Sequence, residues 1–299
     1  MTFRKFSLAA VLATGAVLLP AANAQDWDAV QVRSEPVQGN IHVLFGAGGN
    51  IGVSVGDDGV FIVDDQFAPL TEKIKAAIAE LSDKPIRFAI NTHFHGDHTG
   101  GNENLGKEGT VIIAHDNVRI RMAEGSFIKA FNNRTPAQTG AALPVVTFND
   151  QASLHLNGEQ TRMHHVSNAH TDGDSIVHFE GSNVIHMGDT FFMGRFPFID
   201  VSNGGSVDGV IATANKVLGL TDAETRIIPG HGPVTDEGGL TAYRDMLVTV
   251  RGRVAELKSA GKSLEETQAA GVVDDFMESF GAGGADWAGA FIGFVYDSL

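Results

Sequence analysis

Cysteine is absent from all 299 residues of this chain. Disulfide bonds therefore cannot hold the fold together, and stability has to come from buried apolar side chains and from any metal that the protein binds. The same absence excludes thiolate as a metal ligand. Hydrophobic residues make up 43% of the chain, which is enough for one large domain or two small ones with a well-buried core.

Positive charge is also scarce. The chain has 21 Lys and Arg residues against 36 Asp and Glu residues, which gives a formal net charge of −15. A surface of this sign does not favour general binding to nucleic acid or to an anionic membrane. We therefore expect a small-molecule substrate and no nucleic-acid partner, whereas the composition does not predict an oligomeric state.

The long apolar stretch at the N terminus has the form of a targeting sequence. Arg4 and Lys5 precede an apolar segment at residues 6–20, and a small-x-small cleavage pattern follows at residues 22–24. The segment is shorter than the ~20 residues that a membrane-spanning helix needs. We expect residues 1–24 to be a signal peptide, the mature chain to begin at Gln25, and the mature protein to be periplasmic or secreted without a membrane anchor.

Three histidines and an aspartate lie within six residues, directly after an apolar run at residues 86–90 that is typical of a buried strand. His93 and His95 are two residues apart and can point at one position. Gly96 allows a sharp turn, after which Asp97 and His98 point in a direction that the first pair cannot reach. One cation is therefore not expected to bind all four side chains, whereas two cations roughly 3.5–4 Å apart can.

Each half of such a site needs further ligands, and the sequence contains them at the ends of later strand-like runs. His170 follows the run that ends at Val166, Asp189 follows the run at residues 184–186, and His231 lies in an Ile-Ile-Pro-Gly-His segment. A polar turn without metal is the alternative interpretation of residues 93–98, but it does not explain these three later segments.

The HxHxDH signature, followed by these three segments in this order, resembles the metallo-β-lactamase superfamily from about residue 39 to the C terminus. The resemblance implies two metal ions and assigns their ligands. One metal would bind His93, His95 and His170, the other would bind Asp97, His98 and His231, and Asp189 would bridge the two.

The periodicity of the chain predicts the same fold class as the resemblance. In the first half, strands are expected at residues 41–45, 51–55, 60–64, 86–90 and 111–114, with a helix at 72–81 capped by Thr71 and a short helix from Asp116. In the second half, strands are expected at residues 145–148, 152–156, 161–166, 175–179, 184–186 and 226–228, with helices at 207–218, 239–260, from Ser263, and at 287–296.

Each half of the chain shows a meander of strands followed by βα units. This repeated order predicts an α/β fold of the αβ/βα type. This is a four-layer sandwich of two mixed β-sheets face to face, with helices on the outside. No linker long enough to separate independent domains follows Gln25, so residues 25–299 are expected to form a single domain. Residues 124–144 lose the regular pattern; they are expected to form a covering loop that either packs on the core or lines the substrate cleft.

The ligand set predicts hydrolytic chemistry. Histidine and carboxylate without thiolate suit two zinc ions, although iron or manganese also accept these ligands. Metal binding lowers the pKa of water from 15.7 to roughly 7, so a bridging hydroxide is available at neutral pH. Asp97 and Asp189 are the expected catalytic carboxylates. Redox members of the family usually replace the second histidine of the signature by an acid, and this chain keeps His95.

The substrate is less well defined by the sequence. Arg195, Phe191 and Phe192 follow Asp189 closely and are expected to offer an apolar wall with one cation, and His115 is a further candidate contact. The alternative is that the phenylalanines belong to the core and that Arg195 pairs with Asp200.

Many β-lactamases of the superfamily have a cysteine or a serine near the position of Asp189, so we expect weak β-lactamase activity. The expected reaction is hydrolysis of a carbonyl substrate such as a β-lactam, a lactone or another ester. A phosphodiesterase, a thioester hydrolase resembling glyoxalase II, and a non-catalytic zinc-binding protein are the alternatives.

Overall fold

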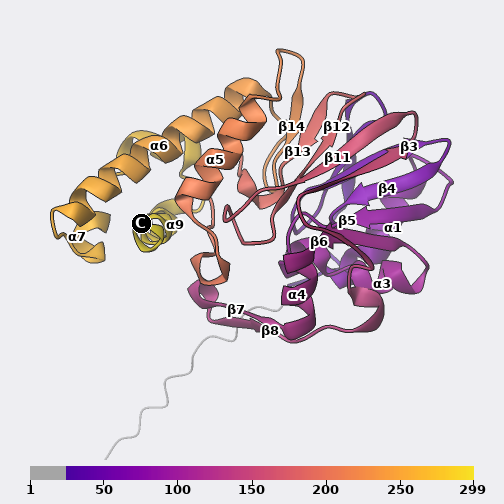
Figure 1. Ribbon diagram of the computed structural model, residues 1–299, viewed down its shortest axis with the longest axis horizontal. Helices are drawn as coiled ribbons and strands as arrows, with labels where there is room; N and C mark the ends of the chain where they lie inside the picture. Colours follow the sequence, from indigo (N-terminus) through magenta and orange to yellow (C-terminus); the bar gives the residue numbers. More distant parts are fainter. Residues whose placement is uncertain (1–24) are drawn as a thin grey trace, which may run out of the picture.

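The computed structural model describes residues 25–299, so the signal peptide expected at residues 1–24 lies outside the described residues. Figure 1 shows two β-sheets stacked against each other, with helices on both outer sides. No helix in the described part of the chain is long and apolar enough to span a bilayer.

The first sheet has seven strands, in the order β1-β2-β3-β4-β5-β6-β9. Its antiparallel half is the meander β1 (Arg33–Gln38), β2 (Ile41–Phe45), β3 (Ile51–Gly56) and β4 (Gly59–Val63). Its parallel half is β5 (Ile86–Ile90), β6 (Val111–His115) and β9 (Val146–Phe148). Four helices belong to this half of the chain: α1 (Thr71–Ala79), α2 (Gly96–Thr99), α3 (Asn102–Lys107) and α4 (Asp116–Glu124).

The second sheet has five strands, in the order β10-β11-β12-β13-β14. They are β10 (Gln151–Leu156), β11 (Glu159–His165), β12 (Ser175–Phe179), β13 (Val184–His186) and β14 (Arg226–Ile228), of which only the β13–β14 pair is parallel. The helices of this half are α5 (Val207–Leu218), which lies between β13 and β14, and α6 (Glu237–Ser259), α7 (Leu264–Gln268), α8 (Met277–Phe280) and α9 (Gly284–Ser298), which follow β14.

Both faces of the first sheet are buried, as its apolar sequence requires. Along β4, Phe61 and Val63 point into the core between the two sheets, where Phe61 stacks on Phe179 of β12. Val60 and Ile62 point to the other face and pack with residues of α1. Alternate residues of one strand therefore fill two layers of core. The four-layer αβ/βα architecture expected from the sequence is confirmed.

Three details differ from the expectation. The strand near residue 146 pairs in parallel with β6 and so belongs to the first sheet, not to the second half of the fold. Thr71 does not cap α1 but is its first residue, and its hydroxyl donates to the carbonyl of Ala68 at 2.9 Å. The expected covering loop contains a short hairpin, β7 (Ser126–Ile128) and β8 (Asn133–Thr135).

Candidate metal centre

The HxHxDH segment turns at the carboxyl end of β5. His93 and His95 lie in the short bend after the strand, where the backbone at His95 is extended, and Asp97 and His98 lie in the single helical turn α2. Backbone N–H groups of His98 and Thr99 donate to the carbonyl of His95, at 3.0 and 3.1 Å, and close this turn. Extended and helical backbone on either side of Gly96 thus point the two pairs of side chains in different directions.

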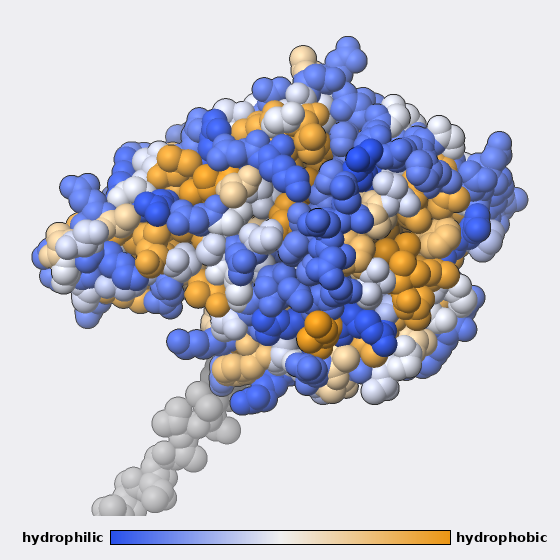
Figure 2. Space-filling view, in the orientation of Figure 1, coloured by the Kyte–Doolittle hydropathy of each residue, from blue (hydrophilic) through white to orange (hydrophobic). Residues whose placement is uncertain are grey.

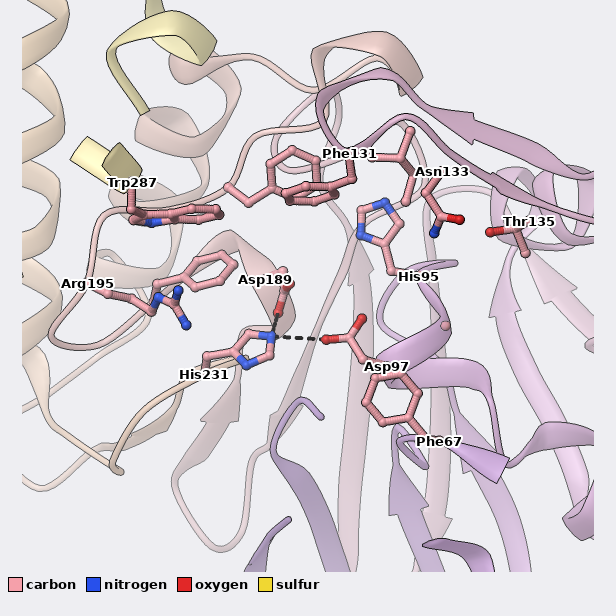
Figure 3. Close-up of a pocket in the computed structure, with 14 residues that line it drawn as sticks. Phe67, His95, Asp97, Phe131, Asn133, Thr135, Asp189, Arg195, His231 and Trp287 are labelled. Atoms are coloured by element: carbon pink, nitrogen blue, oxygen red, sulfur yellow. Dashed lines mark ion pairs between the residues drawn. The ribbon is translucent and has the colours of Figure 1, made fainter. Parts of the chain in front are cut away.

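The second sheet contributes the remaining candidates at the same edge of the sandwich. His170 lies in the connection between β11 and β12, and Asp189 lies in a short 3₁₀ turn (Gly188–Thr190) after β13. His231 follows β14, which is parallel to β13, so the carboxyl ends of both strands lie side by side. Ligands from two sheets therefore meet at one place, as Figure 3 shows for Asp97, Asp189 and His231.

The seven candidate ligands fall into two groups in which the ligand atoms lie within 4.8 Å of one another. The first group is His93, His95, His170 and Asp189, and the second is Asp97, His98 and His231. Three buried ligand atoms have no hydrogen-bond partner: Nε2 of His93, Nε2 of His98 and Oδ1 of Asp189. Buried polar atoms without partners are rare in folded proteins, and here they converge on one point. The residues present therefore fit metal ions.

Asp189 lies between the two groups. Its Oδ1 is 3.1 Å from Nε2 of His98 and 3.4 Å from Nε2 of His231. Its Oδ2 is 3.6 Å from Nε2 of His170 and 3.9 Å from Nε2 of His93. Each carboxylate oxygen thus faces a different set of imidazoles, which is the arrangement that a bridging carboxylate requires.

Carboxylates behind the ligands fix the orientation of two rings. Asp64 accepts from Nδ1 of His98 at 2.7 Å, which leaves Nε2 of that ring free to face the centre. Asp200 lies 3.1 Å from Nε2 of His95, so this ring faces the centre with Nδ1 instead. Such outer contacts select the tautomer and raise the basicity of the ligand nitrogen. No ligand spacing in the sequence points to Asp64 or Asp200, and sequence reasoning missed both.

Asn50 was missed as well. Its side-chain amide donates to the carbonyls of Pro229 and Gly232, at 2.9 and 2.8 Å, and its backbone N–H donates to the carbonyl of Gly230 at 2.7 Å. These three bonds attach the loop that carries His231 to the first sheet.

Burial and charge separate the histidines of the two groups. Burial lowers the pKa of His93 well below its usual value and lowers the pKa of His170 to about 4, so both rings are neutral and can offer a lone pair. Burial acts in the same direction on His231, but the carboxylates of Asp189 and Asp97 outweigh it and raise the pKa to about 9. The second group is therefore rich in negative charge, which favours a bound cation.

A cavity of about 330 Å³ opens onto the centre. Its polar side includes Asp97 and His231, and its other walls are largely apolar (Figure 3). The residues that line it are Phe67, His95, Gly96, Asp97, Ile128, Phe131, Asn133, Thr135, Asp189, Phe192, Arg195, Phe198, His231 and Trp287. The hairpin β7–β8 and helix α9 thus both contribute to the walls.

The structure brings Phe192 and Arg195 into this cavity but not the other two expected contacts. Phe191 is fully buried and packs against Tyr243 of α6, with ring centroids 4.8 Å apart. His115 is buried too: its ring stacks on His165 at 3.7 Å, and its Nδ1 accepts from the backbone N–H of Asn117 at the start of α4. The expectation that Phe191 and His115 line the site is therefore corrected.

The alternative in which Arg195 pairs with Asp200 is not what the structure shows. Asp200 contacts His95 and accepts from Ser202 and Asn203, both at 2.6 Å. Arg195 instead lies over the ring of Trp287, at 5.2 Å from the ring centroid.

Comparison with known proteins gives a family and several relatives. Residues 44–234 match the family described as the metallo-beta-lactamase superfamily. The hydroxyacylglutathione hydrolase of Nitrosococcus oceani is 28% identical over 187 residues, which cover 59% of this chain and 60% of that protein. The 2,4-dinitroanisole O-demethylase subunit alpha of a Nocardioides species is 23% identical over 208 residues, which cover 69% of this chain and 59% of that protein. The chain thus spans about 60% of the length of the first of these relatives.

Solved structures share the fold at low identity. A metallo-beta-lactamase from Pontibacter korlensis superimposes with a TM-score of 0.59 at 16% identity, covering 73% of this chain and 99% of that one. The sec-alkylsulfatase Pisa1 from a Pseudomonas species gives a TM-score of 0.67 at 16% identity, covering 89% of this chain and 50% of that one. At this level of identity the likeness shows a common fold.

Proposed function

This chain belongs to the metallo-β-lactamase superfamily, and from that premise we propose that it is a dinuclear zinc hydrolase that cleaves a carbonyl substrate. The observation that carries the proposal is the position of Asp189, whose two oxygens face two separate groups of ligand atoms. A site for a single metal would not need a carboxylate directed both ways. Iron or manganese would be accepted by the same ligands.

The division of labour follows from the position of each side chain. When bound, two zinc ions would supply Lewis-acid chemistry and a water of lowered pKa. His93, His95 and His170 would hold one ion and Asp97, His98 and His231 the other, with Asp189 between them. Asp97 is also partly exposed to the cavity, with 28% of its side chain accessible. It can therefore accept a hydrogen bond from the attacking water and orient it towards the substrate carbonyl.

The substrate class rests on the walls of the cavity and on Asp189. We propose a lactone or another ester as the preferred substrate, with β-lactams cleaved weakly. A second candidate substrate is a thioester, and the presence of hydroxyacylglutathione hydrolases among the relatives supports this candidate. Phosphodiester hydrolysis and zinc binding without catalysis are the remaining alternatives.

One experiment separates these functions. The protein comprising residues 25–299 is loaded with zinc and its metal content is measured. Turnover is then assayed with nitrocefin, a lactone, an aryl phosphodiester and a thioester. We expect about two zinc ions per chain and the highest kcat/KM on the lactone, and we expect His93→Ala and His231→Ala each to reduce the zinc content. One ion or none in the unaltered protein would end the dinuclear proposal, and two ions without any turnover would favour the non-catalytic alternative.

Export is part of the proposal. The N-terminal segment of residues 1–24 would direct the protein to the periplasm or the medium, where it would act on small molecules. Fractionation of cells that express the full chain, followed by N-terminal sequencing of the exported product, tests this. We expect the product to begin at Gln25, and a full-length product in the cytoplasm would contradict it.

A further inference from the structure

Two aromatic rings from distant parts of the chain lie nearly parallel in the wall of the cavity. Phe131 lies at the tip of the β7–β8 hairpin and Trp287 lies in the first turns of α9. Their ring planes are within 5° of parallel, and their centroids are 6.4 Å apart. In Figure 3 both rings lie across the cavity from Asp97 and His231. We call this pair of rings the aromatic platform.

Both rings of the platform are held in place. The indole Nε1 of Trp287 donates to the backbone carbonyl of Phe196 at 2.8 Å. Phe131 packs against Phe198, with centroids 4.8 Å apart, and Phe198 in turn stacks on the ring of His95. Although it makes these contacts, Phe131 is 51% exposed. A large apolar side chain that is fixed and yet exposed at a cavity is a ready surface for a ligand.

Arg195 supplies a cation next to the platform. Its Nε is buried and has no hydrogen-bond partner, and its guanidinium forms no ion pair with any residue at positions 25–299. Several other arginines of this acidic protein do form ion pairs, for example Arg121 with Asp172 and Arg253 with Asp275. A partly buried guanidinium without an internal anion has donors to spare, and its planar fork matches a carboxylate.

We propose that the substrate carries a planar aromatic group, which stacks on Phe131 and on the part of the Trp287 ring that Arg195 leaves uncovered, and an anionic group such as a carboxylate, which binds the Arg195 guanidinium where it lies over that ring. The inference rests on the proposed hydrolase function and narrows its substrate class to aromatic esters or lactones with an anionic substituent. A flat ring matches two parallel rings better than a puckered aliphatic ring does, because only flat surfaces stay in contact over their whole area. The cation next to the platform sets where the anion lies.

Intrinsic fluorescence provides a readout that does not depend on turnover. The chain has two tryptophans, Trp27 and Trp287, so Trp27→Phe leaves Trp287 as the sole indole. In this background the zinc-loaded protein is titrated with 4-nitrobenzoate, a quencher that cannot be hydrolysed. Competition with benzoate, cyclohexanecarboxylate and benzyl alcohol then gives three dissociation constants. Benzoate and cyclohexanecarboxylate both carry a carboxylate with the same affinity for zinc. The ratio of their dissociation constants therefore isolates the contribution of the flat ring.

We expect benzoate to bind about fivefold more tightly than cyclohexanecarboxylate, which is within the range for one aromatic contact. Phe131→Leu, which keeps an apolar side chain but removes the ring, should bring this ratio close to one. Arg195→Gln should weaken both carboxylates by about tenfold or more, as expected for loss of a charged hydrogen bond, and leave benzyl alcohol unchanged. Ile120→Ala, an exposed apolar residue of α4, and Arg162→Gln, an arginine of β11 paired with Glu180, are the controls and should change none of the constants.

Each other outcome overturns part of the inference. Equal or tighter binding of cyclohexanecarboxylate would show that the platform takes aliphatic groups, and unchanged carboxylate binding in Arg195→Gln would remove the anion site. Absence of quenching would reject the whole inference. Failure of the hydrolase proposal can be told apart from failure of this inference. Specific quenching without turnover of any ester would show a site for aromatic anions in a protein with another function. Ester turnover without this selectivity would support the hydrolase proposal and reject the proposed substrate class.

Discussion

Replacement of Asp64 by asparagine is the sharpest test of how the metal centre is built. Asp64 is fully buried directly after β4, and its Oδ2 accepts from Nδ1 of His98 at 2.7 Å and from the hydroxyl of Thr92 at 2.8 Å. Its Oδ1 accepts from the backbone N–H of Thr92 at 2.8 Å. The carboxylate therefore acts only as an acceptor, and asparagine preserves its shape but brings one N–H₂ group in place of an oxygen.

The expected effect is selective for one metal. If the backbone N–H of Thr92 still donates to the one remaining side-chain oxygen, the N–H₂ group of the introduced asparagine faces His98. Nδ1 of His98 then has no acceptor and can no longer donate a hydrogen bond. The ring must adopt the other tautomer, which places a proton on Nε2, or turn away from the centre. Loss of an outer-shell carboxylate of this kind typically costs about 10–100-fold in metal affinity. The group of Asp97, His98 and His231 should carry this loss, whereas the group of His93, His95 and His170 should keep its affinity.

Zinc titration in competition with a chromophoric chelator gives the two stepwise constants, and cobalt substitution reports which site fills first. Asp65→Asn is the matched control, because Asp65 is the neighbouring buried aspartate and its carboxylate bonds to no ligand side chain. Its Oδ1 accepts from the backbone N–H of Gly101 at 2.8 Å, and burial raises its pKa well above the usual value, so its surroundings disfavour charge and suit a neutral amide of the same shape. Equal weakening of both constants in Asp64→Asn, or the same weakening in Asp65→Asn, would refute the tautomer argument.

The metal centre also sets the outcome of four further experiments, one of which includes a control substitution. Asp200→Asn should show the opposite selectivity in the chelator titration, since Asp200 supports His95 of the first group at 3.1 Å. Gly230→Ala should reduce zinc content measured by elemental analysis, because its Cβ would collide with Oδ1 of Asp189, whereas Gly252→Ala on α6 meets nothing within 4 Å and should raise stability slightly. Removal of metal with EDTA should lower the melting temperature in calorimetry, because a ligand present at 100 times its Kd stabilises the native state by about 2.7 kcal/mol and no disulfide compensates for its loss. Asp189→Ser should raise the ratio of kcat/KM for nitrocefin to that for a lactone, and an unchanged ratio would show that Asp189 does not set this preference.

The sequence predicts which candidate ligands the structure brings together, because they are concentrated in short segments at strand ends. His93, His95, Asp97 and His98 are adjacent, and the later ligands each follow an apolar run, so one pattern fixes their place at one edge of the sandwich. Asp64 and Asp200 escape this reasoning because each acts alone, through a single contact with a ring that is distant in the sequence. Their role depends on tertiary packing.

The errors at the cavity wall have equally local causes. The backbone at Phe191 is extended, with φ −141° and ψ 126°, so the side chains of Phe191 and Phe192 point to opposite sides. Only Phe192 faces the cavity. His115 ends a strand at the correct edge of the sheet, but the helix that follows uses its ring as a cap. In residues 124–144, Ile128 is buried in the core and Phe131 is exposed in the cavity, so both interpretations of this segment apply to different residues.

Each group of candidate ligands contains residues from both sheets, so the metal sites can form only late in folding. His93 and His231 are far apart in the chain, and neither group of ligand atoms exists until the two sheets have docked. Metal therefore recognises only the finished structure, and contacts that form after the transition state slow unfolding without speeding folding. In stopped-flow experiments we therefore expect zinc to leave the folding rate unchanged and to decrease the unfolding rate. Bound metal would then slow the separation of the two sheets.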